Sequence, residues 1–261
     1  MKKRCFSILC MLVFLLTFTG QVIGDSIYAI SALDNNLVKV DSIKEDKGMR
    51  IMVEKGDEKY YYSLNKTTEI IPLQLGKGIY TVKILQNTSG DKYKVIQKQD
   101  ITITNNNLNE IYLASTQPVY WSDKEKVIKL AKDLTKDKKT DKEKVEAIYK
   151  YIVKNIKYDY NKIKGLSNDY VPEIDKILAD KSGICYDYAS LFAGMLRSIG
   201  IPTKLVKGYK NDLKEYHAWN QVLLDGSWIT IDTTYDAALK KGNIKISMIK
   251  DGTEYNNVRE Y

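Results

Sequence analysis

The periodicity of the apolar residues changes near residue 120, and this change divides the chain into two unlike halves. Over residues 27–115, short runs of alternating apolar and polar residues are separated by turn residues, which is typical of a small antiparallel sandwich. Beyond residue 120 the apolar residues recur every three or four positions, as in amphipathic helices. The sequence therefore predicts an α+β chain: an immunoglobulin-like β-sandwich over 25–117, followed by a domain of helices and an antiparallel sheet over 118–261.

Individual elements follow from the same patterns. The strands expected in the first half cover residues 49–53, 59–63, 79–85, 93–96, 101–104 and 110–113. In the second half, Ser122 with Glu125 and Thr140 with Glu143 have the spacing of capping boxes, so we expect a helix to begin at each pair. A further short helix is expected over residues 172–178.

The first 24 residues have the pattern of an export signal. Residues 2–4 are basic, residues 5–18 are apolar, and small or tolerated residues precede Asp25. This order predicts a signal peptide of residues 1–24 that is cleaved after Gly24. An uncleaved membrane anchor is the alternative, but the apolar run is too short to span a bilayer. The protein is therefore expected to be secreted, either extracellular or associated with a cell wall, and a composition with 20 Tyr and four Pro favours a bacterial source.

The rest of the chain has one cysteine, Cys185, and one histidine, His217. Without the first 24 residues, which contain three basic residues and no acidic one, the formal charge falls from +8 to +5. So mild an excess is not typical of a nucleic-acid-binding protein, and no Gly-rich phosphate loop is present. One His and one Cys are too few for a zinc site. We therefore expect no cofactor, no metal, no nucleic-acid partner and no internal disulfide, while the oligomeric state stays open.

Cys185 lies at the start of a predicted buried helix. The apolar residues from Ile184 onwards follow a helical stripe that ends at Gly200, with Pro202 just beyond. In the first turn of a helix, free backbone N–H groups and the helix dipole stabilise a thiolate and can hold an oxyanion. Gly183 would leave room there for a substrate backbone. The alternative is a small buried structural cysteine.

The dipeptide Asp225-Gly226 predicts a hairpin whose two strands cover residues 217–232. In that register His217 lies opposite Thr234, and Asp232 is its diagonal neighbour on the same face, roughly 7–8 Å away at the backbone. A carboxylate at this place would fix the imidazole tautomer and leave the other ring nitrogen for a thiol. The alternative is a structural or surface histidine.

These segments resemble the transglutaminase-like superfamily, within the wider set of papain-like cysteine enzymes. The resemblance is carried by GICYDYASLFAGMLRSIGIPTKLVKGY (183–209) and HAWNQVLLDGSWITIDTTYD (217–236), with VEAIYKYIVKNIKYDY (145–160) upstream. It spans 92 residues, from 145 to 236, in the order and spacing of that family.

The resemblance implies a catalytic triad of nucleophile, general base and acid, and imidazole-orienting residue: Cys185, His217 and Asp232. One departure is Thr233, because many members have Pro after the aspartate. The second oxyanion donor is not evident, and Tyr158 and Trp219 are weak candidates that packing also explains.

The expected function is acyl transfer on protein or peptide amides through a Cys thioester. Hydrolysis, as by a protease or amidase, is favoured because water needs no acceptor site; a protein-crosslinking transglutaminase is the alternative. From another class, a non-catalytic cell-envelope binding protein is also considered. The expected partner is a protein or peptide substrate at the cell envelope, and the first domain is a candidate for contact with a cell-wall polymer.

Overall fold

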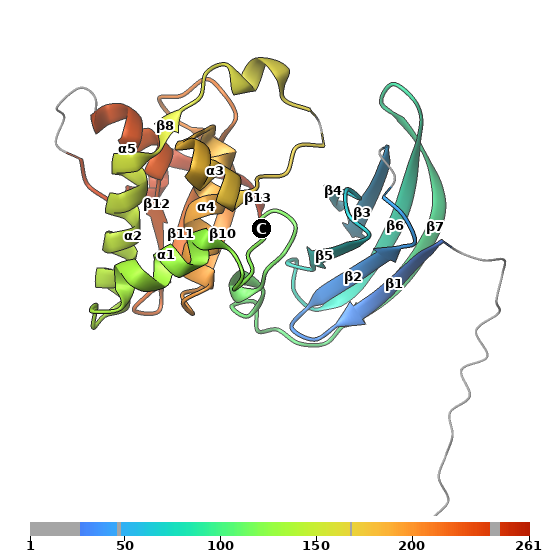
Figure 1. Cartoon of the computed structure of the whole chain (residues 1–261). Helices are drawn as coiled ribbons and strands as arrows, with labels where there is room; N and C mark the ends of the chain where they lie inside the picture. Colours follow the sequence, from blue (N-terminus) through green and yellow to red (C-terminus); the bar gives the residue numbers. More distant parts are fainter. Residues whose placement is uncertain (1–26, 46–47, 168, 241–245) are drawn as a thin grey trace, which may run out of the picture.

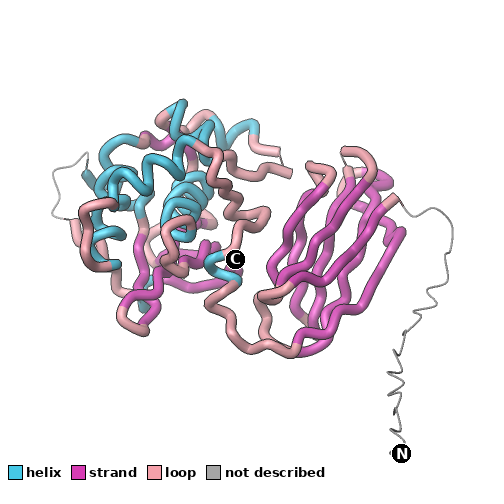
Figure 2. Tube along the Cα trace, turned by 60° about the horizontal axis from the view of Figure 1, so that its bottom comes forward, coloured by secondary structure: helices cyan, strands magenta, loops and turns pink. Residues whose placement is uncertain are grey.

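The structure is a computed structural model that describes residues 27–45, 48–167, 169–240 and 246–261. It contains a unit built of strands and a unit of helices and strands, which lie side by side (Figures 1 and 2). The predicted signal peptide, with cleavage after Gly24, lies outside the described residues. In the described part of the chain, none of the helices combines the length and hydropathy needed to cross a membrane.

The first unit consists of two antiparallel sheets. One has the order β1 (Tyr28–Leu33), β2 (Leu37–Ser42), β5 (Thr68–Pro72), and the other β4 (Glu58–Ser63), β3 (Met49–Lys55), β6 (Gly78–Ser89), β7 (Lys92–Ile103). Side chains from both sheets form one core, in which Val38, Val40, Ile51, Ile71 and Val82 are fully buried. The pairing of the two sheets follows from the alternation of apolar residues along the strands. The immunoglobulin-like assignment stays a prediction.

Three predicted strands of this half differ from the structure. Segments 93–96 and 101–104 are joined in one strand, β7, which pairs with β6; residues 97–100 between them are all polar, so the sequence pattern indicated two strands. Segment 110–113 is wrong as a strand, because residues Ile111–Leu113 form a 3-10 helix. The consecutive residues Ile111 and Tyr112 are both buried, which an alternating strand on a single core does not allow.

The second unit has a four-stranded antiparallel sheet with the order β12 (Ser227–Ile231), β11 (His217–Leu224), β10 (Thr203–Lys210), β13 (Tyr255–Glu260). Its helices are α1 (Lys126–Thr135), α2 (Asp141–Asn155), α3 (Ile174–Asp180), α4 (Cys185–Arg197) and α5 (Thr233–Leu239). Helix α4 is central, because it contacts β10, β11 and the other four helices. Strands β8 (Lys157–Tyr158) and β9 (Ser182–Gly183) form a short parallel pair just before α4. This unit confirms the α+β prediction for residues 118–261 at the level of mixed helices and sheets.

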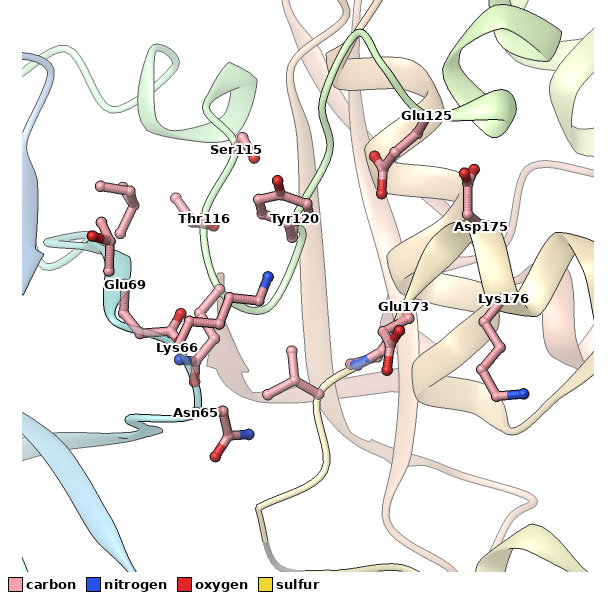
Figure 3. Close-up of a pocket in the computed structure, with 15 residues that line it drawn as sticks. Asn65, Lys66, Glu69, Ser115, Thr116, Tyr120, Glu125, Glu173, Asp175 and Lys176 are labelled. Carbon is pink, nitrogen blue, oxygen red and sulfur yellow. The ribbon is translucent and has the colours of Figure 1, made fainter. Parts of the chain in front are cut away.

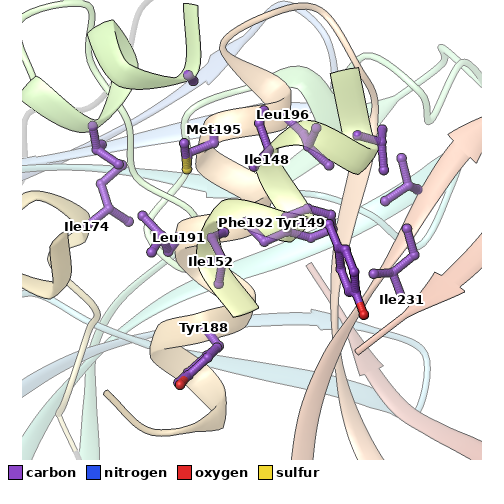
Figure 4. Close-up of a cluster of buried hydrophobic side chains, with 14 of the residues drawn as sticks. Ile148, Tyr149, Ile152, Ile174, Tyr188, Leu191, Phe192, Met195, Leu196 and Ile231 are labelled. Carbon is purple, nitrogen blue, oxygen red and sulfur yellow. The ribbon is translucent and has the colours of Figure 1, made fainter. Parts of the chain in front are cut away.

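The hydrophobic stripe of α4 forms the middle of the core (Figure 4). Its fully buried residues are Tyr188, Leu191, Phe192, Met195 and Leu196, and they pack against Ile148 and Ile152 of α2. Burial of each such side chain contributes about 1.5–3 kcal/mol. The helix, and with it the position of its first residue, is therefore fixed by a large apolar surface, as the sequence predicted.

The two capping predictions have different outcomes. Helix α2 begins after Thr140, whose side chain and that of Glu143 form the predicted capping box. Helix α1 begins at Lys126, one turn later than the pair Ser122 and Glu125 predicted. The carboxylate of Asp175 in α3 accepts from the N–H groups of Lys126 and Val127, at 3.1 and 2.9 Å, so a tertiary contact caps this helix.

The β11–β12 hairpin has the predicted register, with Leu224 opposite Ser227. Pairing ends at Ile231, however, because Asp232 caps α5 by accepting from the N–H of Tyr235. Thr234 is therefore in a helix and does not lie opposite His217, which corrects the predicted length of the hairpin.

Candidate active site

His217 and Asp232 form a buried pair at the edge of the sheet. The imidazole Nε2 lies 2.8 Å from Oδ2 of Asp232, whose side chain is fully buried. The same carboxylate accepts from the backbone N–H of Tyr235 at 2.9 Å and from the hydroxyl of Tyr255 at 3.3 Å. An ionised carboxylate only accepts hydrogen bonds, so Nε2 of His217 donates. The other ring nitrogen, Nδ1, is left for a second partner.

That partner is Cys185, the first residue of α4. Its side chain is half-buried and lies beside His217, where it helps to raise the pKa of the imidazole. Three residues that are far apart in the sequence thus meet where the N-terminus of α4 reaches the start of β11. The structure brings together all three residues that the sequence singled out, although Asp232 reaches His217 from a helix cap and not from a strand.

The charge on Asp232 sets the protonation of the histidine. Burial alone would lower the pKa of His217, but the charge and hydrogen bond of Asp232, followed by Cys185, raise it to about 10. His217 is therefore an imidazolium near neutral pH, and an imidazolium stabilises a neighbouring thiolate. This is the electrostatic arrangement of an ion-paired Cys and His.

Comparison with known proteins agrees with this geometry. Residues 128–233 match the transglutaminase-like superfamily, and the matched segment contains Cys185, His217 and Asp232. Residues 128–233 of the chain are a transglutaminase-like domain.

Other comparisons are more distant. An uncharacterized protein of Mycobacterium leprae (strain TN) is 32% identical over 82 residues, which cover 28% of this chain and 29% of that protein. The match therefore spans less than a third of the curated relative. The periplasmic domain of TgpA from Pseudomonas aeruginosa has 16% identity and a TM-score of 0.42, over 82% of this chain and 74% of that one. Calcium-bound LapG from Legionella pneumophila has 18% identity and a TM-score of 0.41, over 54% and 77%.

A buried carboxylate holds the start of α4 in the transglutaminase-like domain. Asp187 is fully buried and accepts from the N–H of Ile184 at 2.8 Å, from Lys162 Nζ at 2.6 Å and from the Tyr170 hydroxyl. A Cβ on Gly183 would lie 2.6 Å from Cβ of Asp187. Gly183 therefore makes room for Asp187, and its predicted role of admitting a substrate backbone stays a prediction.

Sequence reasoning missed this network, which involves the segment of residues 161–170. The available signal was Asp187, an acidic residue in the first turn of the predicted helix, where carboxylates are favoured. In the structure the described part of the segment is held at both ends. Lys162 and Tyr170 bind Asp187, while Asp169 forms an ion pair with Arg50 of β3 at 2.9 Å.

Both candidates for the second oxyanion donor lie near the triad. The indole of Trp219 stacks on the imidazole of His217, with ring centroids 6.2 Å apart, and its buried Nε1 has no hydrogen-bond partner among the described residues. Tyr158 is half-buried; burial, and after it the charge of Cys185, raise its pKa to about 12. Tyr158 therefore keeps its proton near neutral pH and is a hydrogen-bond donor close to Cys185.

A cavity of about 730 Å³ lies elsewhere, between β5 and α3 (Figure 3). Its labelled side chains include Lys66, Glu69, Tyr120, Glu173 and Asp175, and none of the triad residues lines it. Volume alone does not make it a site, and it has no nucleophile paired with a base. Within the described ranges, no group of three or more His, Cys, Asp or Glu side chains is placed to hold a metal ion.

Proposed function

We propose that the transglutaminase-like domain is a cysteine enzyme that cleaves or transfers acyl groups of protein or peptide amides through a thioester on Cys185. The observation that carries the proposal is the position of His217, which has Asp232 on Nε2 and Cys185 as its other side-chain partner. A nucleophile beside a base that a third group orients is the arrangement required for covalent acyl transfer. Cys185, His217 and Asp232 are accordingly proposed as the catalytic triad.

The mechanism follows from these three groups. The Cys185 thiolate attacks the amide carbonyl, and the imidazolium of His217 donates its Nδ1 proton to the leaving amine. The free amine departs and a thioester remains on Cys185. Neutral His217 then takes a proton from water or an incoming amine, which attacks the thioester and releases an acid or a new amide together with the thiolate. Asp232 holds the ring orientation throughout.

Hydrolysis is the favoured outcome and crosslinking the alternative. A water molecule needs no acceptor site, whereas efficient crosslinking must admit a primary amine and exclude water. The protein is therefore proposed to act as a protease or amidase.

The test uses a substrate that requires no knowledge of the natural one. 4-Nitrophenyl acetate should give a burst of nitrophenolate and an acetyl group on Cys185, seen by mass spectrometry of the Cys185 peptide. Added glycinamide then competes with water for the thioester, and the ratio of N-acetylglycinamide to acetate separates a transferase from a hydrolase.

Cys185→Ala should abolish the burst, and His217→Ala should slow it. Acetylation of Cys185 at a rate that His217→Ala leaves unchanged would overturn the proposal and favour a non-catalytic envelope protein, in which Cys185 is structural.

We further propose that the chain is exported and acts at the cell envelope, and that residues 25–117 are an immunoglobulin-like domain that binds a cell-wall polymer. The basic and apolar pattern of residues 1–24 supports export. Retention of the full chain on isolated cell walls, compared with retention of a Tyr61→Ala variant that changes an exposed side chain of β4, tests the binding role.

A further inference from the structure

Strand β10 contains three lysines, and one of them differs from the other two. Lys204 pairs with Glu260 at 2.8 Å, and Lys210 pairs with Asp212 at 2.5 Å and Glu254 at 3.2 Å. Within the described part of the chain, no carboxylate lies within ion-pair distance of Nζ of the middle lysine, Lys207. Its cation contacts aromatic rings instead.

These rings place Lys207 beside the nucleophile. Its Nζ lies 3.5 Å from the ring centroid of Tyr186, the residue that follows Cys185, and 5.3 Å from that of Tyr261. Both rings pack, together with Cys185, against the same small cluster of buried residues. In the sheet, Lys207 pairs with Ala218, the neighbour of His217. Burial lowers the pKa of Lys207 to about 8, while Cys185 acts in the opposite direction.

Apart from Cys185 in its thiolate form, this cation has no compensating anion among the described residues. Removing an ammonium group from water costs free energy unless a carboxylate or hydrogen-bond acceptors replace the water. Aromatic faces offset part of this cost, and they are apolar surfaces on which a hydrocarbon stem can lie. Lys207 and Cys185 are both half-buried, so each is open to solvent in part. The charge of Lys207, which lies above the ring of Tyr186 next to Cys185, could bind a ligand carboxylate, and the ring could contact a short apolar chain that carries it.

We propose that Lys207 is a specificity-determining residue, which binds a carboxylate of the substrate close to the amide that Cys185 attacks. The inference rests on the proposed function, because it names the class of substrate for the same site. The preferred substrates would be acidic peptides or amides with a free carboxylate near the scissile bond, and neutral analogues of the same size would react more slowly.

Alkylation of Cys185 tests the charge without any substrate. Iodoacetate and iodoacetamide transfer groups of nearly equal size to the same sulfur, but only iodoacetate is an anion. The rates are measured on the full chain near neutral pH by mass spectrometry of the Cys185 peptide. Lys207→Met should lower the iodoacetate rate relative to the iodoacetamide rate by about tenfold, as expected for one charge acting over a few ångströms in a partly screened cleft.

Two variants complete the alkylation test. Lys207→Arg keeps the charge and should keep the parent ratio. Lys204→Met removes the same charge from the same strand, at a lysine that pairs with Glu260, and should leave the ratio unchanged. An equal loss of both rates in Lys207→Met would mean that the lysine acts on the thiolate and not on the ligand, and an unchanged ratio would mean that it binds no anion. Either result overturns the proposal.

Two further pairs of probes locate the carboxylate. 4-Nitrophenyl hemisuccinate and 4-nitrophenyl butyrate compare a charged with a neutral acyl group, and glycine and glycinamide compare a charged with a neutral acceptor amine. A preference for the charged member that Lys207→Met removes, in either pair, supports the proposal and assigns the acyl or the amine side. Absence of any such preference contradicts it. The reaction with 4-nitrophenyl acetate tests the thioester chemistry separately, so failure of the specificity proposal is distinguishable from failure of the proposed function.

Discussion

Asp232 determines the state of the site at the scale of single residues. It is fully buried, and its acceptor positions are used by His217, Tyr235 and Tyr255. Its charge and its hydrogen bond favour the protonated form of His217. Because the folded pKa of His217 is raised to about 10 from its ordinary value of 6.5, the imidazolium stabilises the fold fully below pH 6.5, and this contribution is lost as the pH rises through about 10.

Asp232→Asn should therefore lower the pKa of His217 by several units, because it removes the charge that opposes the effect of burial. His217 is the only histidine of the chain, so its ring resonances can be followed by NMR without ambiguity. In parallel, the free energy of unfolding of the parent should decrease between pH 6.5 and about 10 more steeply than that of the variant. The same NMR midpoint in both proteins would contradict the role of Asp232.

Tyr158 is the more accessible of the two candidate oxyanion donors. Tyr158→Phe should slow acylation by 4-nitrophenyl acetate about 10²-fold, the usual cost of losing one such donor. Alkylation by iodoacetamide forms no oxyanion and should not change. The matched control is Tyr160→Phe, since the Tyr160 ring lies 4.8 Å from that of Tyr158 but is exposed. Unchanged acylation in Tyr158→Phe would favour the buried indole of Trp219.

At the scale of elements, the pairing of β10 with β13 leaves little space next to His217. The pairing of the two strands shifts between Lys207 and Gly208. Gly208 lies directly opposite His217 on β11. A Cβ on Gly208 would lie 2.0 Å from the backbone oxygen of Asn256 and 2.9 Å from the ring of Trp219, which stacks on His217.

Gly208→Ala should consequently lower the free energy of unfolding by at least about 1–3 kcal/mol, the usual cost of overpacking, and slow alkylation of Cys185. Urea denaturation measures the first effect. Gly165→Ala is the control, because a Cβ there would contact nothing within 4 Å. Equal stability of the two variants would show that the bulge tolerates a side chain and is not a rigid support.

The sequence predicted those elements whose patterns are local. The apolar stripe from Ile184 to Ile199 is sufficient to place α4, and the Asp225-Gly226 turn sets the hairpin register. Capping of α1 by Asp175 was not predictable, because it depends on contact with another helix. The alternation of side chains along the hairpin also predicted that Asp232 lies beside His217. The pair is correct, but Asp232 caps helix α5, which begins where the strand was expected to continue.

At the scale of the whole molecule, side chains from both units meet at one interface. The ring of Tyr261 lies 5.5 Å from that of Tyr60 and 6.0 Å from that of Tyr62, both on β4. Gln117, which lies where the chain passes from the first unit into the second, is buried; it accepts from the N–H of Ser63 at 2.9 Å and donates to the carbonyl of Ser63 at 2.6 Å. The strand unit and the transglutaminase-like domain are therefore expected to unfold together and not as independent domains.

Gln117→Ala should lower the free energy of unfolding of the full chain by about 1–3 kcal/mol, because it leaves the two backbone groups of Ser63 buried and unpaired. Gln99→Ala, on the exposed face of β7, is the matched control and should be nearly neutral. If thermal unfolding shows that the Gln117 variant is as stable as the control, the interface does not couple the two units.

The proposed acyl transfer is best tested by the rate of alkylation of Cys185 by iodoacetamide as a function of pH, in the parent, His217→Ala and Asp232→Asn. We expect rapid alkylation that persists below neutral pH in the parent, is slowed by Asp232→Asn, and is lost in His217→Ala, because the imidazolium stabilises the thiolate. Slow alkylation that neither substitution alters would identify Cys185 as a buried structural residue and contradict the proposed acyl-transfer function.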